Sequence, residues 1–240
     1  MTTDLAIVDL GLGNLRSVEK AVAAAAEHAG AGVPSITHDP EVIARATRVV
    51  VPGQGAFRDG AAALAKDGGA LAQALRETIG KGTPYLGICL GLQLLLDDSE
   101  EAPGSKGLGV FAGSVRRIPD DLVFEGRRLK VPHMGWNQPH LLANRAGEAA
   151  RDALGAAGEC TYPRPAFGGS VDLPWFYFVH SYHAVPADPS LVAATASYGC
   201  LEITAALAEG PLLATQFHPE KSQRAGLAML EAFLRRPSRM

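Results

Sequence analysis

The stretch Tyr85-Leu86-Gly87-Ile88-Cys89-Leu90-Gly91-Leu92-Gln93-Leu94-Leu95 predicts a buried strand that ends at a single cysteine, followed at once by an apolar helix. A side chain at such a sharp turn is pushed out at the carboxyl end of the sheet, and the turn needs glycines because it brings backbone segments together. Gly87 and Gly91 stand two residues on either side of Cys89. The spacing therefore indicates a nucleophilic thiol, although a small buried core residue is the competing interpretation.

Two stretches suit the stabilisation of negative charge near this thiol. The helix predicted after Cys89 directs its positive N-terminal end at the sulfur, which favours the thiolate, and the Leu90 N–H is placed to bind an oxyanion. A second loop, at residues 51–57, follows another strand and contains Gly53, Gln54 and Gly55. Its glycines allow peptide N–H groups to turn inward, but an ordinary strand-to-helix turn explains them equally well.

A cysteine nucleophile needs a base, and the base needs a group that orients it. His218 ends the strand predicted at residues 212–217, and Pro219 keeps the residue before it out of helical conformation. In an extended chain, residues two apart face the same way, so Glu220 can reach the imidazole. A helix start, with Pro219 in its first position, is the other interpretation of the same residues.

Composition excludes several classes of function. The 240 residues are 47% hydrophobic and 20% charged with a net charge of −3, which predicts one domain over residues 1–240 and no nucleic-acid surface. No signal segment and no membrane-spanning run is predicted. Three cysteines without CxxC spacing fit neither disulfides nor zinc, and the spacing of His180 and His183 suits a metal only on a helix. We expect a cytoplasmic protein without a metal.

The order of the predicted elements indicates the fold class. Short apolar runs alternate with helical patterns in the first half, and the second half is richer in strands. The prediction is therefore an α/β fold with a mostly parallel central sheet flanked by helices, and an additional strand-rich second half. We expect strands at residues 5–9, 35–38, 47–51, 84–88, 114–118, 129–132, 175–180, 193–197, 204–207 and 212–217, and helices at residues 14–29, 60–79, 90–97 and 223–234.

Two stretches do not follow this pattern. Residues 144–174 are rich in alanine and glycine and then in proline, and we interpret them as a surface insertion with one short helix at residues 147–157. Residues 11–16 begin like a dinucleotide-binding loop, but Arg16 occupies the third glycine position and would obstruct the close packing of helix and strand. No cofactor is therefore expected.

Three motifs in order, P-G-Q-G-A-F, G-I-C-L-G-L-Q and F-H-P-E, resemble the class I (triad) glutamine amidotransferases. Two further stretches, at residues 132–137 and 216–223, resemble the glutaminase subunits of imidazole glycerol phosphate synthase, and residues 9–15 fit the same subfamily. The resemblance covers nearly the whole chain except residues 144–174. It implies a flavodoxin-like fold and a heterodimer that works in histidine biosynthesis.

The resemblance also implies roles for individual residues. The thiolate of Cys89 would attack the side-chain amide of glutamine, His218 would transfer protons, and Glu220 would orient His218. The oxyanion would be bound by Leu90 N–H and by a peptide N–H of the loop Gly53-Gln54-Gly55. Four residues would line the glutamine pocket, with plain packing as the alternative: Gln93, His180, Ser181 and Tyr182.

The partner implied by the resemblance is a (β/α)8 cyclase subunit that uses the ammonia to make imidazole glycerol phosphate and aminoimidazole carboxamide ribotide. Five residues would face it, although a core role competes for the aromatic ones: Asn14, Trp136, Asn137, Tyr177 and Lys221.

Two features depart from the family pattern. Gln54 stands where a small aliphatic residue is expected, and residues 144–174 are longer than the resemblance suggests.

Two alternatives compete with this function. One is the glutaminase of another synthase, of the anthranilate type. The other is a non-catalytic binding module that keeps the elbow cysteine, against which Glu220 argues, because such a module needs no carboxylate on its histidine.

Overall fold

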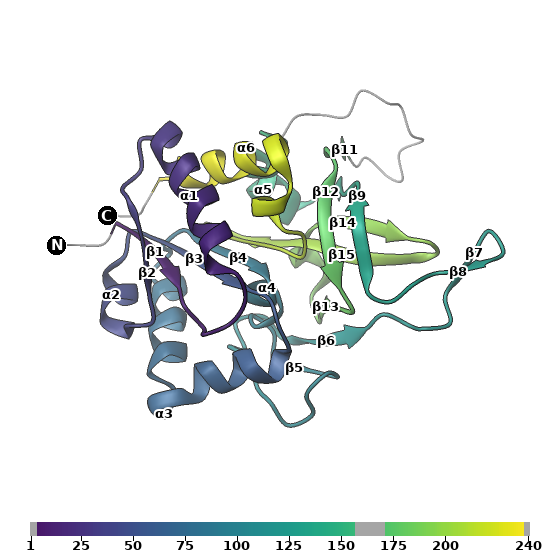
Figure 1. Ribbon diagram of the computed structural model, residues 1–240, viewed down its shortest axis with the longest axis horizontal. Helices are drawn as coiled ribbons and strands as arrows, with labels where there is room; N and C mark the ends of the chain where they lie inside the picture. Colours follow the sequence, from purple (N-terminus) through teal and green to yellow (C-terminus); the bar gives the residue numbers. More distant parts are fainter. Residues whose placement is uncertain (1–3, 157–170, 238–240) are drawn as a thin grey trace.

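A nine-stranded mixed sheet forms the centre of the molecule in the computed structural model, which describes residues 4–156 and 171–237 (Figure 1). Its strand order is β11-β10-β14-β15-β16-β4-β3-β1-β2. The strands from β16 to β2 are parallel to one another, as the alternation of strands and helices predicted. They are β1 (Leu5–Val8), β2 (Pro34–Thr37), β3 (Arg48–Gly53), β4 (Tyr85–Cys89) and β16 (Leu212–Thr215).

Four further strands of the strand-rich second half extend this sheet at the side of β16. β15 (Leu201–Glu209) pairs antiparallel with β16 and with β14 (Val192–Tyr198), and β10 (His140–Leu141) and β11 (Val171–Asp172) complete the edge. The prediction of a mostly parallel sheet therefore holds for the first half of the chain, while the second half adds antiparallel strands.

Three smaller sheets lie beside the central one. The first pairs β9 (His133–Asn137) with β12 (Phe176–His180). The second joins β5 (Asp98–Ser99), β6 (Gly113–Arg117) and β13 (Tyr182–Pro186). The third, β7 (Val123–Phe124) with β8 (Arg127–Arg128), extends away from the rest of the molecule (Figure 1).

Helices cover both faces of the central sheet. α1 (Leu15–Ala29), α5 (Arg145–Gly155) and α6 (Gln223–Leu234) lie on one face, and α2 (Pro40–Arg45) and α3 (Phe57–Gly80) on the other (Figure 1). Two hydrophobic clusters fill the spaces between helices and sheet. Single helical turns follow β13 and β16, at η1 (Pro189–Leu191) and η2 (Pro219–Lys221). Every helix of the described residues is too short or too polar to span a lipid bilayer.

The helix predicted at residues 90–97 is much shorter in the structure. α4 (Leu90–Gln93) is a single turn, because the carbonyl groups of Leu94, Leu95 and Leu96 accept hydrogen bonds from the backbone of residues 108–111 instead of continuing the helix. A dipole of one turn is small, so it contributes less to a thiolate at Cys89 than the sequence suggested.

Two other local predictions need correction. Residues 129–132 form no strand; they connect β8 to β9, a strand that the strand prediction missed. Part of the predicted surface insertion belongs to the core, since Ala150 and Leu154 of α5 are fully buried against the sheet. Residues 157–170 lie outside the described residues, so the insertion there and the single domain over residues 1–240 stay predictions.

Candidate active site

Three neighbouring parallel strands bring the predicted catalytic residues together. In the sheet, β4 lies between β3 and β16, with Cys89 level with Gly53 on one side and Ile88 level with Thr215 on the other. The segments that leave the carboxyl ends of these strands therefore meet at one place, as is usual for ligand sites in open α/β sheets. Cys89, the Gly53 loop and His218 come from these three segments.

Cys89 stands at a strained turn between β4 and α4. Its φ of 53° and ψ of −102° are uncommon for a residue with a side chain, and such strain tends to be kept at functional sites. A Cβ on Gly87 would approach the Gly91 carbonyl oxygen to 2.7 Å, and one on Gly91 would approach the Val51 carbonyl oxygen to 1.9 Å. Both glycines are therefore required for the close contact of backbones that the sequence predicted.

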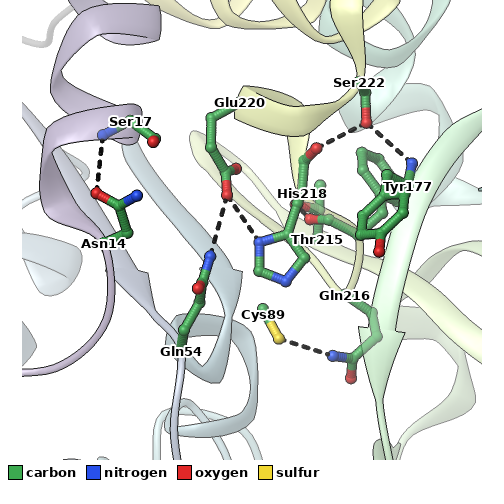
Figure 2. Close-up of polar contacts among 11 residues, drawn as sticks. Asn14, Ser17, Gln54, Cys89, Tyr177, Thr215, Gln216, His218, Glu220 and Ser222 are labelled. Carbon is green, nitrogen blue, oxygen red and sulfur yellow. Dashed lines mark hydrogen bonds and ion pairs between the residues drawn. The ribbon is translucent and has the colours of Figure 1, made fainter. Parts of the chain in front are cut away.

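His218 and Glu220 form a buried pair beside the thiol (Figure 2). The Nδ1 of His218 lies 2.8 Å from Oε1 of Glu220, and each side chain is only 1% exposed. His218 is extended, with φ −104° and ψ 96°, and Pro219 begins the single turn η2, so both interpretations of the motif hold together. Ser222 fixes the backbone by donating its hydroxyl to the His218 carbonyl oxygen at 2.6 Å.

The electrostatics of the site favour a protonated His218. Burial by itself lowers the pKa of His218, but the interactions of its ring with Cys89 and Glu220 outweigh it and raise the pKa to about 10. The Nε2 of His218 has no hydrogen-bond partner among the described residues, and the ring lies between Glu220 and Cys89 (Figure 2). This nitrogen is free to exchange a proton with a reacting group.

The predicted oxyanion residues lie next to the sulfur. A Cβ on Gly53 would approach the Leu90 Cβ to 2.7 Å, so the loop after β3 packs directly on the start of α4. Gly55 is exposed and has φ 144°, a conformation that glycine tolerates and other residues avoid. Gln54, the departure from the family pattern, directs its side-chain amide to Glu220 Oε1 at 3.5 Å (Figure 2).

A cavity of about 570 Å³ opens at Cys89. All four predicted pocket residues line it: Gln93, His180, Ser181 and Tyr182. Glu101 and Arg117 also line the cavity, and sequence reasoning missed both. They come from the segment after β5 and from β6, and no motif marked them, because only the folding of the smaller sheet onto α4 brings them to the thiol.

Two of the predicted pocket residues already use their polar atoms within the protein. Gln93 Nε2 donates to the Tyr182 carbonyl oxygen at 3.0 Å and contacts Gln216 Oε1 at 3.2 Å. Both ring nitrogens of His180 are engaged as well, with His133 and with the Tyr182 carbonyl oxygen. A direct role in holding a substrate's charged groups therefore suits Glu101, Arg117, Ser181 and Tyr182 better.

Comparison with known proteins identifies the family. The sequence profile of the family "Glutamine amidotransferase class-I" matches residues 7–236. "Imidazole glycerol phosphate synthase subunit HisH" of Methylococcus capsulatus is 44% identical over 97% of this chain and 96% of its own length, and that of Chromobacterium violaceum is 44% identical over 96% of each. The chain belongs to the HisH family of class I glutamine amidotransferases.

Solved structures agree with the fold of this HisH-family chain. The "Structure of PurLQS from Thermotoga maritima" superimposes with a TM-score of 0.64 at 16% identity, covering 98% of both chains. A "Crystal structure of glutamine amidotransferase" gives a TM-score of 0.58 at 19% identity over 95% of this chain and 98% of the other. The predicted family and the α/β fold class are thereby confirmed.

The five residues predicted to face a partner occupy different positions in this HisH-family chain. Asn14 is exposed at the start of α1, where its side chain accepts a hydrogen bond from the Ser17 N–H at 3.4 Å. Trp136 is 44% exposed and contacts Tyr177 edge to face at 6.1 Å, and the Lys221 ammonium lies 5.9 Å from the Tyr177 ring centre.

Asn137 faces the interior instead. Residues alternate between the two sides of a strand, and Asn137 shares the inner side of β9 with buried His133. Its amide is occupied by the Ser197 carbonyl oxygen, by His133 and by the Gln138 N–H.

We predict that Gln54→Ala lowers kcat for glutamine hydrolysis two- to fivefold. Gln54 is one of two groups that contact the Glu220 carboxylate, and loss of a long hydrogen bond costs about 0.5–1 kcal/mol. Steady-state glutaminase kinetics measure the effect. Gln73→Ala is the matched control, since Gln73 contacts the carboxylate of Glu77 on the exposed surface of α3 and does not line the cavity at Cys89. Equal kcat values for the two variants would contradict the prediction.

Proposed function

We propose that this chain hydrolyses glutamine to glutamate and ammonia through a cysteine thioester, and delivers the ammonia to a cyclase subunit for imidazole glycerol phosphate synthesis. The observation that carries the proposal is the meeting of Cys89, His218 and Glu220 at the carboxyl ends of β4 and β16, beside a cavity large enough for an amino acid. A nucleophile, a base and an orienting carboxylate are the parts that amide hydrolysis requires.

The first half of the reaction forms the thioester. The Cys89 thiolate attacks the side-chain amide carbon of glutamine, and the carbonyl oxygen becomes an oxyanion next to the Leu90 N–H and the loop Gly53-Gln54-Gly55. His218, protonated at Nε2, gives this proton to the departing nitrogen, so the C–N bond breaks and ammonia leaves. The imidazole is then neutral and Cys89 carries the glutamyl group.

The second half restores the enzyme. Neutral His218 accepts a proton from water, and the resulting hydroxide attacks the thioester carbon. The C–S bond breaks, glutamate leaves, and Cys89 is again a thiolate beside the His218 imidazolium. Glu220 holds Nδ1 throughout, so that Nε2 always faces the sulfur and the imidazolium is stabilised when it forms.

The walls of the cavity suit a free amino acid. Glutamine carries one positive and one negative charge at its α-carbon, and the cavity offers the Glu101 carboxylate and the Arg117 guanidinium. Glu101 is held by the Phe57 N–H at 2.7 Å, and Arg117 by Asp120 at 2.9 Å. We propose that these two charges, with Ser181 and Tyr182, hold the substrate's α-ammonium and α-carboxylate groups.

The outer face of the β9–β12 pair is the proposed docking surface for the cyclase. Met134 and Trp136 are 61% and 44% exposed on β9, and Tyr177 lies opposite Trp136 on β12. Exposed aromatic and methionine side chains are enriched at protein interfaces. Lys221 lies over Tyr177 and also lines the cavity at Cys89, so the docking surface adjoins the active site.

A binding titration tests the proposed partner. With a (β/α)8 cyclase subunit of imidazole glycerol phosphate synthase from the same source, Trp136→Ala is expected to raise Kd at least about thirtyfold, the usual effect of losing an interface tryptophan worth 2 kcal/mol. Phe124→Ala is the control, since Phe124 is also an exposed aromatic, at 46%, but lies on the separate β7–β8 ribbon. Equal affinity of both variants, or no binding by the unmodified chain, would exclude this docking surface.

A further inference from the structure

A continuous chain of buried hydrogen bonds connects the inner side of β9 to the sulfur of Cys89. Its members come from separate segments of the chain and, apart from the partly exposed Asn137 and Tyr182, each is at most 8% exposed. In order, they are Asn137, His133, His180, the Tyr182 carbonyl oxygen, Gln93, Gln216 and Cys89. The mechanism above uses only the last of these groups as a reactant.

The backbone determines the direction of the first bonds. Asn137 Oδ1 accepts from the Gln138 N–H at 2.8 Å and Nδ2 donates to the Ser197 carbonyl oxygen at 2.9 Å, so the orientation of the amide is fixed. The other Nδ2 hydrogen therefore points to Nε2 of His133, 3.3 Å away, and this nitrogen must be an acceptor.

The two histidines continue the chain in one direction only. His180 Nδ1 faces the Tyr182 carbonyl oxygen at 2.9 Å and must carry a proton, which leaves its Nε2 as the acceptor of the proton on His133 Nδ1, 3.0 Å away. Burial holds the pKa of His133 down to about 4 and that of His180 to about 3, so both rings stay neutral near pH 7. Each ring is thus held as the Nδ1–H tautomer.

The Tyr182 carbonyl oxygen also determines the orientation of the Gln93 and Gln216 side-chain amides. Gln93 Nε2 is 3.0 Å from the Tyr182 oxygen, so this end of its amide is the donor, and its second hydrogen points to Gln216 Oε1 at 3.2 Å. The amide of Gln216 is thereby oriented with its nitrogen towards Cys89 Sγ, at 3.5 Å (Figure 2). A rotation of the Gln216 amide by 180° would place two NH2 groups together at Gln93 and the amide oxygen at the sulfur.

We infer that Gln216 is a positioning residue that stabilises the thiolate form of Cys89 through an N–H donor whose orientation is imposed by the Tyr182 carbonyl oxygen and Gln93. A hydrogen bond to a charged acceptor is stronger than one to a neutral acceptor, so the donor favours S⁻ over S–H. Since α4 is only one turn long, the dipole of this helix stabilises a thiolate only weakly. The Gln216 N–H adds to that stabilisation. The inference rests on the proposed role of Cys89 as the nucleophile.

The position of the Gln216 side chain does not allow it to contact a substrate in the cavity. The residue is fully buried with 0% exposure, and it is absent from the residues that line the cavity. Its side chain touches the sulfur from the side of β16, opposite the Gly53 loop that packs on Leu90. It therefore acts through Cys89.

Alkylation of the full-length chain by iodoacetamide, followed at the Cys89 peptide by mass spectrometry from pH 5 to pH 10, tests the inference. Gln216→Met keeps the volume but lacks the donor, and we expect its alkylation rate at pH 6 to fall at least about tenfold while the rates converge at high pH, where the thiol is ionised in any case. Gln138→Met is the matched control: Gln138 is also buried, and its amide donates to the Leu173 carbonyl oxygen.

The outcomes separate this inference from the proposed function. A Gln216→Met profile that matches the control, or one lowered equally at every pH, would overturn the thiolate role. If the unmodified chain shows no reactive Cys89 at pH 6, the proposed nucleophile fails first.

Discussion

Cys89→Ala is expected to abolish glutamine hydrolysis, lowering kcat by at least about a thousandfold, because alanine has no thiol with which to form the covalent intermediate. The variant keeps His218 and Glu220, but it has no thiolate that can attack the amide carbon of glutamine. The measurement is release of glutamate from glutamine, with the cyclase partner present so that the assembled enzyme is tested.

The fold should survive this change. Alanine is smaller than cysteine, and both residues accept the positive φ at this turn equally poorly. Circular dichroism and partner binding should therefore match the unmodified chain. Cys200→Ala is the control, since Cys200 is an exposed free cysteine outside the site. Turnover of glutamine by Cys89→Ala at more than a few per cent of the original rate would refute the nucleophile.

Gly91→Ala is expected to lower the free energy of unfolding by more than about 3 kcal/mol, a magnitude that is typical of severe steric clashes or packing defects. The new Cβ would lie 1.9 Å from the carbonyl oxygen of Val51 and 3.0 Å from its carbonyl carbon. Val51 cannot move away, because β3 is held between β1 and β4 in the centre of the sheet. Urea unfolding measures the change.

Gly80→Ala provides the comparison for this prediction. Gly80 ends α3, and a Cβ there meets nothing within 4 Å. Alanine is the better helix former by up to about 1 kcal/mol, so this variant should be as stable as the unmodified chain or slightly more stable. Similar unfolding midpoints for Gly91→Ala and Gly80→Ala would show that the turn at Cys89 does not need glycine at position 91.

Sequence patterns were most accurate where the chain interacts with itself over short distances. The helix predicted at residues 223–234 is α6 residue for residue, and the helix predicted at residues 14–29 is α1, which begins one residue later. The contact between His218 and Glu220 could also be predicted, because residues two positions apart in an extended segment face the same way. These features depend on residues at most four positions apart.

Predictions failed where distant segments compete for the same backbone groups. The helix after Cys89 is short because residues 108–111 take the carbonyl groups that would have continued it. α5 belongs to the core, although its Ala-rich sequence has a single large apolar residue, Leu154. The local sequence pattern reveals neither the pairing with residues 108–111 nor the sheet on which α5 packs.

The amino-acid sequence by itself determined the chemistry of the site: a cysteine between spaced glycines, and a histidine that proline keeps extended towards a nearby acid. Only the tertiary structure decided which other groups meet them, because Glu101, Arg117 and Gln216 reach the thiol through the pairing and packing of separate segments. The direction of a buried hydrogen bond is likewise fixed by its neighbours in space, because the Tyr182 carbonyl oxygen orients Gln93, and Gln93 in turn orients the Gln216 donor that faces the sulfur.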